Sequence, residues 1–229
     1  MLTTVTLNAA VDVTYTAENF TLDKVNRALA KRELPGGKGI NVARIAHTLG
    51  TAVQATGFAA GQNGKFIQDK LTDEGIANAF LEVAGESRRC LAIIDPAANT
   101  QTELLETGPT VSAAAFAAFR EHLRAITAES QVVVFSGSLP GGLPSDAYAR
   151  LLEELPNKKL ILDTSGEALK AGIKARPFMV KPNEDELAAF FGRPVRELPE
   201  VLAAGEQLLS FGIELVVISL GSRGAVAVS

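Results

Sequence analysis

The chain has 229 residues, 47% of them hydrophobic, which is enough to bury a core in one or two domains. Its formal net charge of −4 argues against a nucleic-acid-binding surface, where a basic face is expected. The single cysteine, Cys90, excludes an internal disulfide, and with only two histidines a histidine-based metal site is not expected. No signal peptide is visible and no apolar run could cross a bilayer, so we expect a cytoplasmic protein without membrane contacts.

Short β-branched runs alternate with longer helical patterns along the chain. The predicted strands are residues 4–7, 53–58, 132–135, 160–162, 178–180 and 215–219. The predicted helices are residues 40–49, 65–74, 113–128, 146–155, 184–191 and 199–211. The strands are apolar on both faces, which is typical of a parallel sheet covered by helices on both sides. We therefore predict a doubly wound α/β fold that binds ligands beyond the carboxyl ends of its strands.

Two segments, at about residues 12–34 and 88–106, interrupt this alternation. Both contain strand-like runs with polar interruptions, and residues 13–16, 91–94 and 102–105 could pair with one another. They could form a β-hairpin flap with one solvent-exposed face, or a lid over a ligand site that also makes a dimer contact. Because no interdomain linker is visible, we expect one domain over residues 1–229 that carries these lid strands.

The glycine-rich segment Pro35-Gly36-Gly37-Lys38-Gly39-Ile40-Asn41 opens a predicted helix. Glycine allows a ligand to approach the backbone closely, and the free N–H groups of a first helical turn favour an anion. The segment matches neither the P-loop pattern nor a G-x-G-x-x-G fingerprint. On loop chemistry alone, a phosphate or sugar site and a plain helix-entry turn are about equally supported.

Three further segments have both a structural and a functional interpretation. Asp12 follows the first predicted strand, where it could accept hydrogen bonds from sugar hydroxyls, although a turn aspartate is favoured. Small residues at 136–142 follow another strand, where a ligand or a simple loop would fit equally. Asn183 and Glu186 form a capping box, and the same Glu186 could lie near Mg²⁺ while Lys181 contacts a phosphate.

Taken in order, these motifs resemble those of the phosphofructokinase B (ribokinase-like) sugar kinases. The motifs that carry the resemblance are residues 6–12 (TLNAAVD), 35–44 (PGGKGINVAR), 136–140 (SGSLP), 162–169 (LDTSGEAL), 180–187 (VKPNEDEL) and 218–221 (ISLG). The resemblance extends from Thr3 to the last residue. It is to the branch that phosphorylates ketohexose phosphates, and residues 88–93 and 102–109 slightly favour tagatose 6-phosphate over fructose 1-phosphate.

The resemblance implies a ribokinase-like fold with a small β-strand lid, and transfer of the ATP γ-phosphoryl group to a sugar hydroxyl. It also implies Mg²⁺, with Glu186 associated with the ion. The implied substrate-binding residues are Asp12, Lys24, Gly36, Gly37, Lys38, Asn41, Arg88 and Ser138, with Lys38, Arg88 and Lys24 near the substrate's own phosphate. The implied nucleotide-binding residues are Lys181, Asn183, Ser219, Gly221 and Gly224. A homodimer through the lid strands is a further implication.

The sequence departs from this family's pattern in two places. Ala9 occupies a position where the branch usually has proline, so the turn before Asp12 could be looser. The family's Gly-Ala-Gly-Asp-type motif, which supplies the catalytic base, does not occur in the 229 residues. We therefore expect the C-terminal part of the fold to be missing and the chain to be inactive, without a catalytic aspartate. The alternative is a non-catalytic fragment that binds a sugar phosphate.

Overall fold

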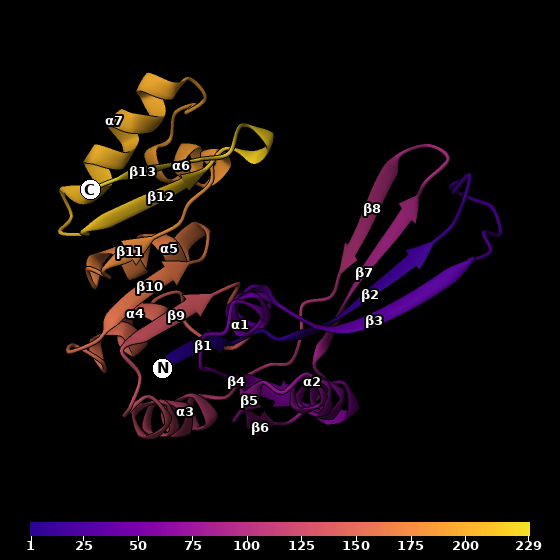
Figure 1. The fold of residues 1–229 in the computed structure, drawn as a ribbon, viewed down its shortest axis with the longest axis horizontal. Helices are drawn as coiled ribbons and strands as arrows, with labels where there is room; N and C mark the ends of the chain where they lie inside the picture. The colour runs from indigo at the N-terminus through magenta and orange to yellow at the C-terminus, as the bar shows by residue number, and fades with distance from the viewer.

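A nine-stranded sheet forms the body of the molecule in the computed structural model, which describes residues 1–229 (Figure 1). The spatial order is β13-β12-β11-β10-β9-β1-β4-β5, and β6 also pairs with β4. Its strands are β1 (Leu2–Thr6), β4 (Val53–Ala60), β5 (Ala77–Asn78), β6 (Leu81–Val83), β9 (Val132–Ser136), β10 (Lys159–Asp163), β11 (Met179–Val180), β12 (Leu215–Ser219) and β13 (Ala225–Val228). All neighbours run parallel except β12 and β13.

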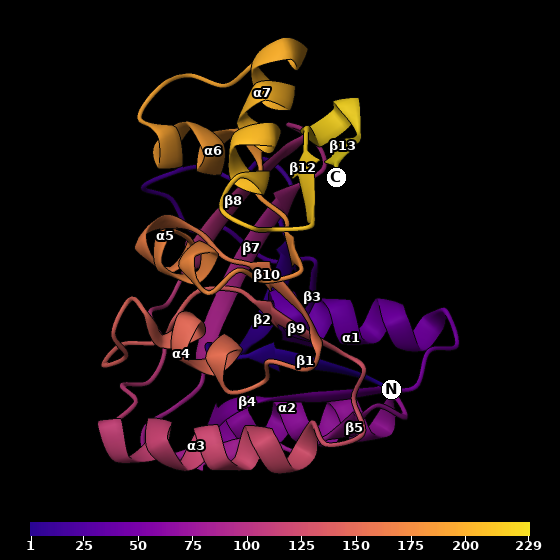
Figure 2. The same ribbon diagram turned by 90° about the vertical axis from the view of Figure 1, so that its left-hand side faces the viewer.

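Helices lie on both sides of this sheet, with α4, α5 and α6 on one side of β9 and β10 and α1 on the other (Figure 2). The helices are α1 (Lys38–Thr48), α2 (Gly61–Asp73), α3 (Ala113–Ile126), α4 (Ala147–Glu153), α5 (Gly166–Lys174), α6 (Glu184–Phe191) and α7 (Leu198–Leu209). The main core includes Phe58 and Phe119, whose rings are tilted by 45° to each other with centroids 4.8 Å apart. None of the helices combines the length and the apolarity needed to cross a bilayer.

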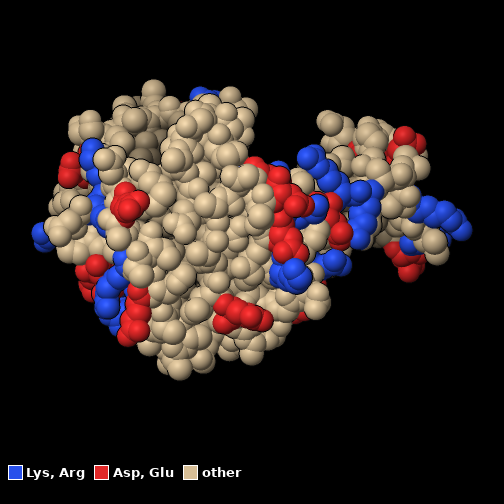
Figure 3. Space-filling view, turned by 60° about the horizontal axis from the view of Figure 1, so that its bottom comes forward, with Lys and Arg blue, Asp and Glu red and all other residues tan.

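A separate four-stranded sheet, the lid sheet, projects from the body (Figures 1 and 3). Its order is β3 (Ala30–Gly36), β2 (Ala10–Thr16), β7 (Arg88–Asp95) and β8 (Thr100–Leu105). Val11 and Val13 are buried in a second, smaller core with residues of α1 and α2, and this core anchors the lid sheet to the body. Figure 3 shows acidic and basic side chains side by side where the lid sheet joins the body.

The doubly wound α/β prediction is confirmed, as is strand pairing in the two interrupting segments. The prediction missed the short strands β5 and β6, and also two longer elements, β3 and α5. Strand β3 contains Lys31, Arg32 and Glu33, and its exposed, charged residues gave no strand signal; an edge strand can carry such residues because one side remains in solvent. Helix α5 is short and begins at Gly166, a residue with φ +60° that usually ends rather than starts a helix.

Candidate functional site

Three glycines bring the start of α1 against the end of β1 and against β2. An added Cβ at Gly36 would lie 2.1 Å from Cγ of Asp12, and one at Gly39 would lie 2.4 Å from Oγ1 of Thr6. Gly37 has φ +109°, a conformation that L side chains rarely adopt. Only residues without a side chain fit this junction, so α1 can begin at Lys38 directly after β3 ends.

Asp12 lies within strand β2, where it pairs with Leu34 of β3 and Cys90 of β7. The favoured interpretation of Asp12 as a turn residue was therefore wrong. The predicted run covered only residues 13–16, and pairing with both β3 and β7 extends the strand back to Ala10, so that it includes Asp12. In β2 the Asp12 carboxyl is fixed beside the backbone of Gly36.

A cavity of about 510 Å³ lies between the lid sheet and the start of α1. Five of the predicted substrate-binding residues line it: Asp12, Gly37, Lys38, Asn41 and Arg88. Residues of β7 and β8 form most of the remaining wall. Burial raises the pKa of Asp12, while the charges of Arg88 and Arg44 oppose that shift and Glu103 adds to it. The cavity thus presents a carboxylate acceptor and two cations to one ligand.

The remaining three predicted substrate residues are placed differently. Gly36 touches the Asp12 carboxyl but does not line the cavity. Ser138 follows β9, and its hydroxyl lies 3.2 Å from the Asn8 amide nitrogen, which donates to it. Lys24 is exposed and lies in the connection between β2 and β3. Figure 1 shows this connection at the outer end of the lid sheet. The structure does not bring Lys24 to the cavity.

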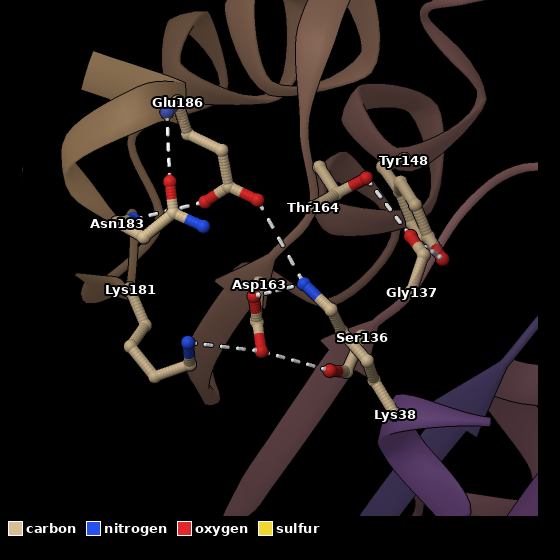
Figure 4. A network of polar contacts seen from close by, with 9 residues as sticks. All are labelled: Lys38, Ser136, Gly137, Tyr148, Asp163, Thr164, Lys181, Asn183 and Glu186. Atoms are coloured by element: carbon tan, nitrogen blue, oxygen red, sulfur yellow. Dashed lines mark hydrogen bonds and ion pairs between the residues drawn. The ribbon is translucent and has the colours of Figure 1, made fainter. Parts of the chain in front are cut away.

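A second polar cluster is centred on Asp163, at the carboxyl end of β10 (Figure 4). Nζ of Lys38 is 3.2 Å from Oδ1 of Asp163, and Nζ of Lys181 is 3.4 Å from Oδ2. The same Lys38 Nζ is 3.8 Å from Oε1 of Glu186. Asp163 is only 7% exposed, so the two ammonium groups compensate a nearly buried charge. Lys38 therefore belongs to both groups, because it also lines the cavity beside Asp12.

Asp163 was not predicted as a site residue, although a signal for it existed. It directly follows an apolar run that was predicted to be a strand, so it had to lie on the ligand side of the sheet. Ser136, the last residue of β9, donates to Oδ2 of Asp163 at 3.3 Å. Polar residues that end neighbouring parallel strands meet at one edge of a sheet, and this rule identifies both.

The loop after β9 is fixed by hydrogen bonds to Gly137, which has φ +107°. The hydroxyls of Tyr148 and Thr164 donate to its carbonyl oxygen at 3.1 and 2.9 Å. Its own N–H donates to the carbonyl of Asp163 at 2.9 Å. Burial raises the pKa of Tyr148, with the charge of Asp163 acting in the same direction, so the phenol remains a donor.

The predicted nucleotide-binding residues gather beside this cluster. The capping box is confirmed: the Asn183 side chain accepts from the Glu186 N–H at 2.8 Å, and Glu186 accepts from the Asn183 N–H at 3.0 Å. Ser219 forms a β-bridge with Asn183. Gly221 and Gly224 lie in the turn between β12 and β13 with open space around them. No group of three or more His, Cys, Asp or Glu side chains is arranged to hold a metal ion.

Comparisons with known proteins identify the family and the fold. The sequence pattern of the pfkB family carbohydrate kinases matches residues 4–229. Phosphofructokinase-2 from Escherichia coli in complex with fructose-6-phosphate is similar, with 29% identity, a TM-score of 0.92, and coverage of 100% of this chain and 76% of that chain. A "possible 1-phosphofructokinase" from Thermotoga maritima has 27% identity and a TM-score of 0.91, with coverage of 100% and 74%.

Ribokinase from Thermotoga maritima is similar in fold, with 19% identity, a TM-score of 0.74, and coverage of 100% of this chain and 74% of that chain. The predicted ribokinase-like fold class is therefore confirmed.

The Gly137 carbonyl provides a test of how the loop is held. Tyr148→Phe and Thr164→Val should each lower the free energy of unfolding by about 1 kcal/mol, because the other hydroxyl still satisfies the carbonyl. In the double variant the free energy of unfolding should fall by more than the sum of the two single losses, because a partly buried acceptor is left without a partner. Urea unfolding of the four proteins measures this; additive losses would contradict it.

The raised pKa of Asp12 predicts a cost in stability. The pKa of Asp12 is higher in the folded state than in the unfolded state. At pH values between these two pKa values the folded protein binds more protons, so the free energy of unfolding falls as the pH rises through this range. At neutral pH Asp12 is ionised in both states, so the full cost of burying its charge is present. Asp12→Asn removes this charge and should raise the melting temperature at that pH. Thermal unfolding at about pH 4 and about pH 7 should show a smaller difference between variant and wild type at the lower pH. A variant that melts lower at neutral pH would refute the assignment.

Proposed function

The chain belongs to the pfkB family of carbohydrate kinases, and on this premise we propose that it binds ATP and a ketohexose phosphate for phosphoryl transfer to a sugar hydroxyl. One observation carries the proposal. Lys38 lines the cavity that holds Asp12 and Arg88, while its ammonium group meets Asp163 and Glu186 beside Lys181. A single cation thus joins a sugar-sized cavity to a cluster suited to phosphates. The fructose-6-phosphate in the complex of the Escherichia coli relative also supports a sugar phosphate ligand.

In the sugar subsite, Arg88 would bind the substrate's phosphate and Asp12 would accept hydrogen bonds from its hydroxyls, beside Gly37 and Asn41. Nε of Arg88 donates to the Asn8 carbonyl at 3.2 Å, and Nη1 to the Glu106 carbonyl at 3.4 Å. These contacts orient the guanidinium and leave Nη2 for a ligand. Positioning of this kind accounts for much of the catalysis of phosphoryl transfer.

In the nucleotide subsite, Lys38 and Lys181 would bind phosphate oxygens, with Asn183, Ser219 and the glycines of the β12–β13 turn along the nucleotide. The carboxylates of Asp163 and Glu186 fit Mg²⁺, because this ion is usually held by one or two carboxylates together with phosphates and water. When bound, the ion neutralises charge on the phosphoryl group. Lys38 is proposed as the cation shared by the two subsites.

For the sugar, we keep tagatose 6-phosphate slightly ahead of fructose 1-phosphate, on the resemblance of residues 88–93 and 102–109. The proposed location is the cytoplasm. Because no Gly-x-Gly-Asp sequence occurs in the 229 residues, we expect the polypeptide to bind both ligands without ordinary turnover. The second candidate function is therefore a sugar-phosphate-binding module.

Isothermal titration calorimetry separates the subsites. Arg88→Ala should raise the dissociation constant of tagatose 6-phosphate roughly 10-fold to 100-fold and leave that of ATP unchanged, because a charge-assisted phosphate contact is lost from one subsite only. Lys181→Met should raise the dissociation constant of ATP by a similar factor and leave that of the sugar phosphate unchanged. The exposed Lys65→Met on α2 is the matched control. Equal effects of Arg88→Ala and Lys181→Met on both ligands would contradict two subsites.

An assay with ATP and each sugar phosphate should detect no turnover above background. Ordinary kinase turnover would overturn the inactivity proposal and leave the subsites intact. Binding of neither sugar phosphate would overturn the proposed function itself.

We also propose a homodimer through the lid sheet. Strand β8 is one of the two edges of this sheet, and every residue of β8 is exposed. Leu104 and Leu105 are among the exposed large apolar side chains. Such an edge is suited to a second copy of the chain.

Sedimentation velocity tests this assembly. Leu104→Lys should raise the dimer dissociation constant at least roughly tenfold, because it would place an unpaired charge in an apolar contact. Leu202→Lys, at an exposed position of α7, is the control. A wild-type monomer at all concentrations, or a variant that dimerises as well as wild type, would contradict the proposal.

A further inference from the structure

Asn8 joins three segments that are far apart in the sequence. Its side-chain nitrogen donates to the Thr107 carbonyl, just beyond lid strand β8, and to the Ser138 hydroxyl in the loop after β9, both at 3.2 Å. Asn8 itself follows β1 and is only 5% exposed. One buried amide therefore connects the base of the lid sheet to the central strands of the body.

The orientation of this amide follows from its partners. The Thr107 carbonyl can only accept, so the nitrogen of Asn8 must face it. The oxygen then points towards Gly108, which has φ +88°, and an added Cβ there would lie 2.3 Å from Oδ1. This oxygen is buried and has no hydrogen-bond partner. Because an unpaired buried acceptor costs free energy, the arrangement is not explained by its stability alone.

Arg88 depends on the same connection. Its Nε bonds to the backbone carbonyl of Asn8, and its Nη1 bonds to the carbonyl of Glu106, the neighbour of Thr107. Both acceptors that orient the guanidinium therefore belong to segments that the Asn8 side chain ties together. If that side chain were removed, the two acceptors could move apart, and Arg88 would lose its fixed direction.

We propose that Asn8 is a positioning residue that couples the base of the lid sheet to the Ser138 loop and thereby aims Arg88 at the substrate's phosphate. This inference rests on the proposed function. It assigns Asn8 a role in ligand affinity that acts through Arg88, without contact between the Asn8 side chain and the ligand. Asn8 does not line the cavity.

A double-mutant cycle tests the coupling. Asn8→Ala and Arg88→Ala are made singly and together, and the dissociation constant of tagatose 6-phosphate or fructose 1-phosphate, whichever binds wild type more tightly, is measured by calorimetry. Asn8→Ala should weaken binding roughly tenfold in the wild-type background and less than about twofold in the Arg88→Ala background. An equal loss in both backgrounds would show a general structural role and overturn the inference.

A second variant and a second measurement distinguish the proposed effect from misfolding of Asn8→Ala. Asn8→Asp has the same shape but cannot donate to the Thr107 carbonyl, so it should weaken binding at least as much and again only when Arg88 is present. Amide hydrogen exchange in residues 88–95 should become faster in both Asn8 variants. The control is Asn78→Ala, whose amide nitrogen bonds to Gln68 and Ile76 carbonyls beside α2, and which should change neither readout.

The outcomes separate the two proposals. If wild type binds neither sugar phosphate, the proposed function fails. If wild type binds and Arg88→Ala weakens binding but Asn8→Ala and Asn8→Asp do not, only the role of Asn8 fails. Unchanged hydrogen exchange in the Asn8 variants would also overturn the coupling.

Discussion

The close approach of backbone at Gly36, Gly37 and Gly39 is the constraint on which both parts of the site depend. These residues let β3 end beside the Asp12 carboxyl and let α1 begin at once against Thr6 of β1. Any side chain at these positions would push α1 away from the sheet, and Lys38 is the first residue of that helix. The cavity wall formed by Asp12 and the reach of Lys38 to Asp163 thus have a single steric origin.

The charged groups of the two subsites are held in different ways. Asp163 is nearly buried, and it stays close to Lys38 and Lys181, whose side chains remain partly exposed at 50% and 37%. Because Asp163 is nearly buried, these ion pairs offset the cost of burying its charge, and they also hold the two ammonium groups near each other. In the lid cavity, by contrast, Asp12 carries a raised pKa because of burial, and Arg88 is held by backbone carbonyls rather than by a carboxylate. Its charge is thus available to an anionic ligand.

The sequence predicted the body of the fold because its strands are continuous apolar runs and its helices have clear periodicity. Strand β12 was predicted to the residue, and most other elements differ by a few residues at their ends. Strand β3 was missed, since its formation depends on pairing with β2 rather than on its own residues. Asp12 lies in a strand because β2 pairs with both β3 and β7 at this position. The meeting of Lys38 with Asp163, 125 residues apart, depends on the crossing of α1 over the sheet, which local patterns do not contain.

The central claim is that one lysine joins a sugar-phosphate cavity to a nucleotide-phosphate cluster. A crystal structure with tagatose 6-phosphate and a non-hydrolysable ATP analogue tests it most directly. The account predicts the sugar's own phosphate at Arg88, its hydroxyls at Asp12, and the nucleotide's phosphates at Lys38 and Lys181. A sugar phosphate bound away from Arg88 and Asp12, or a nucleotide bound away from Lys181, would contradict it.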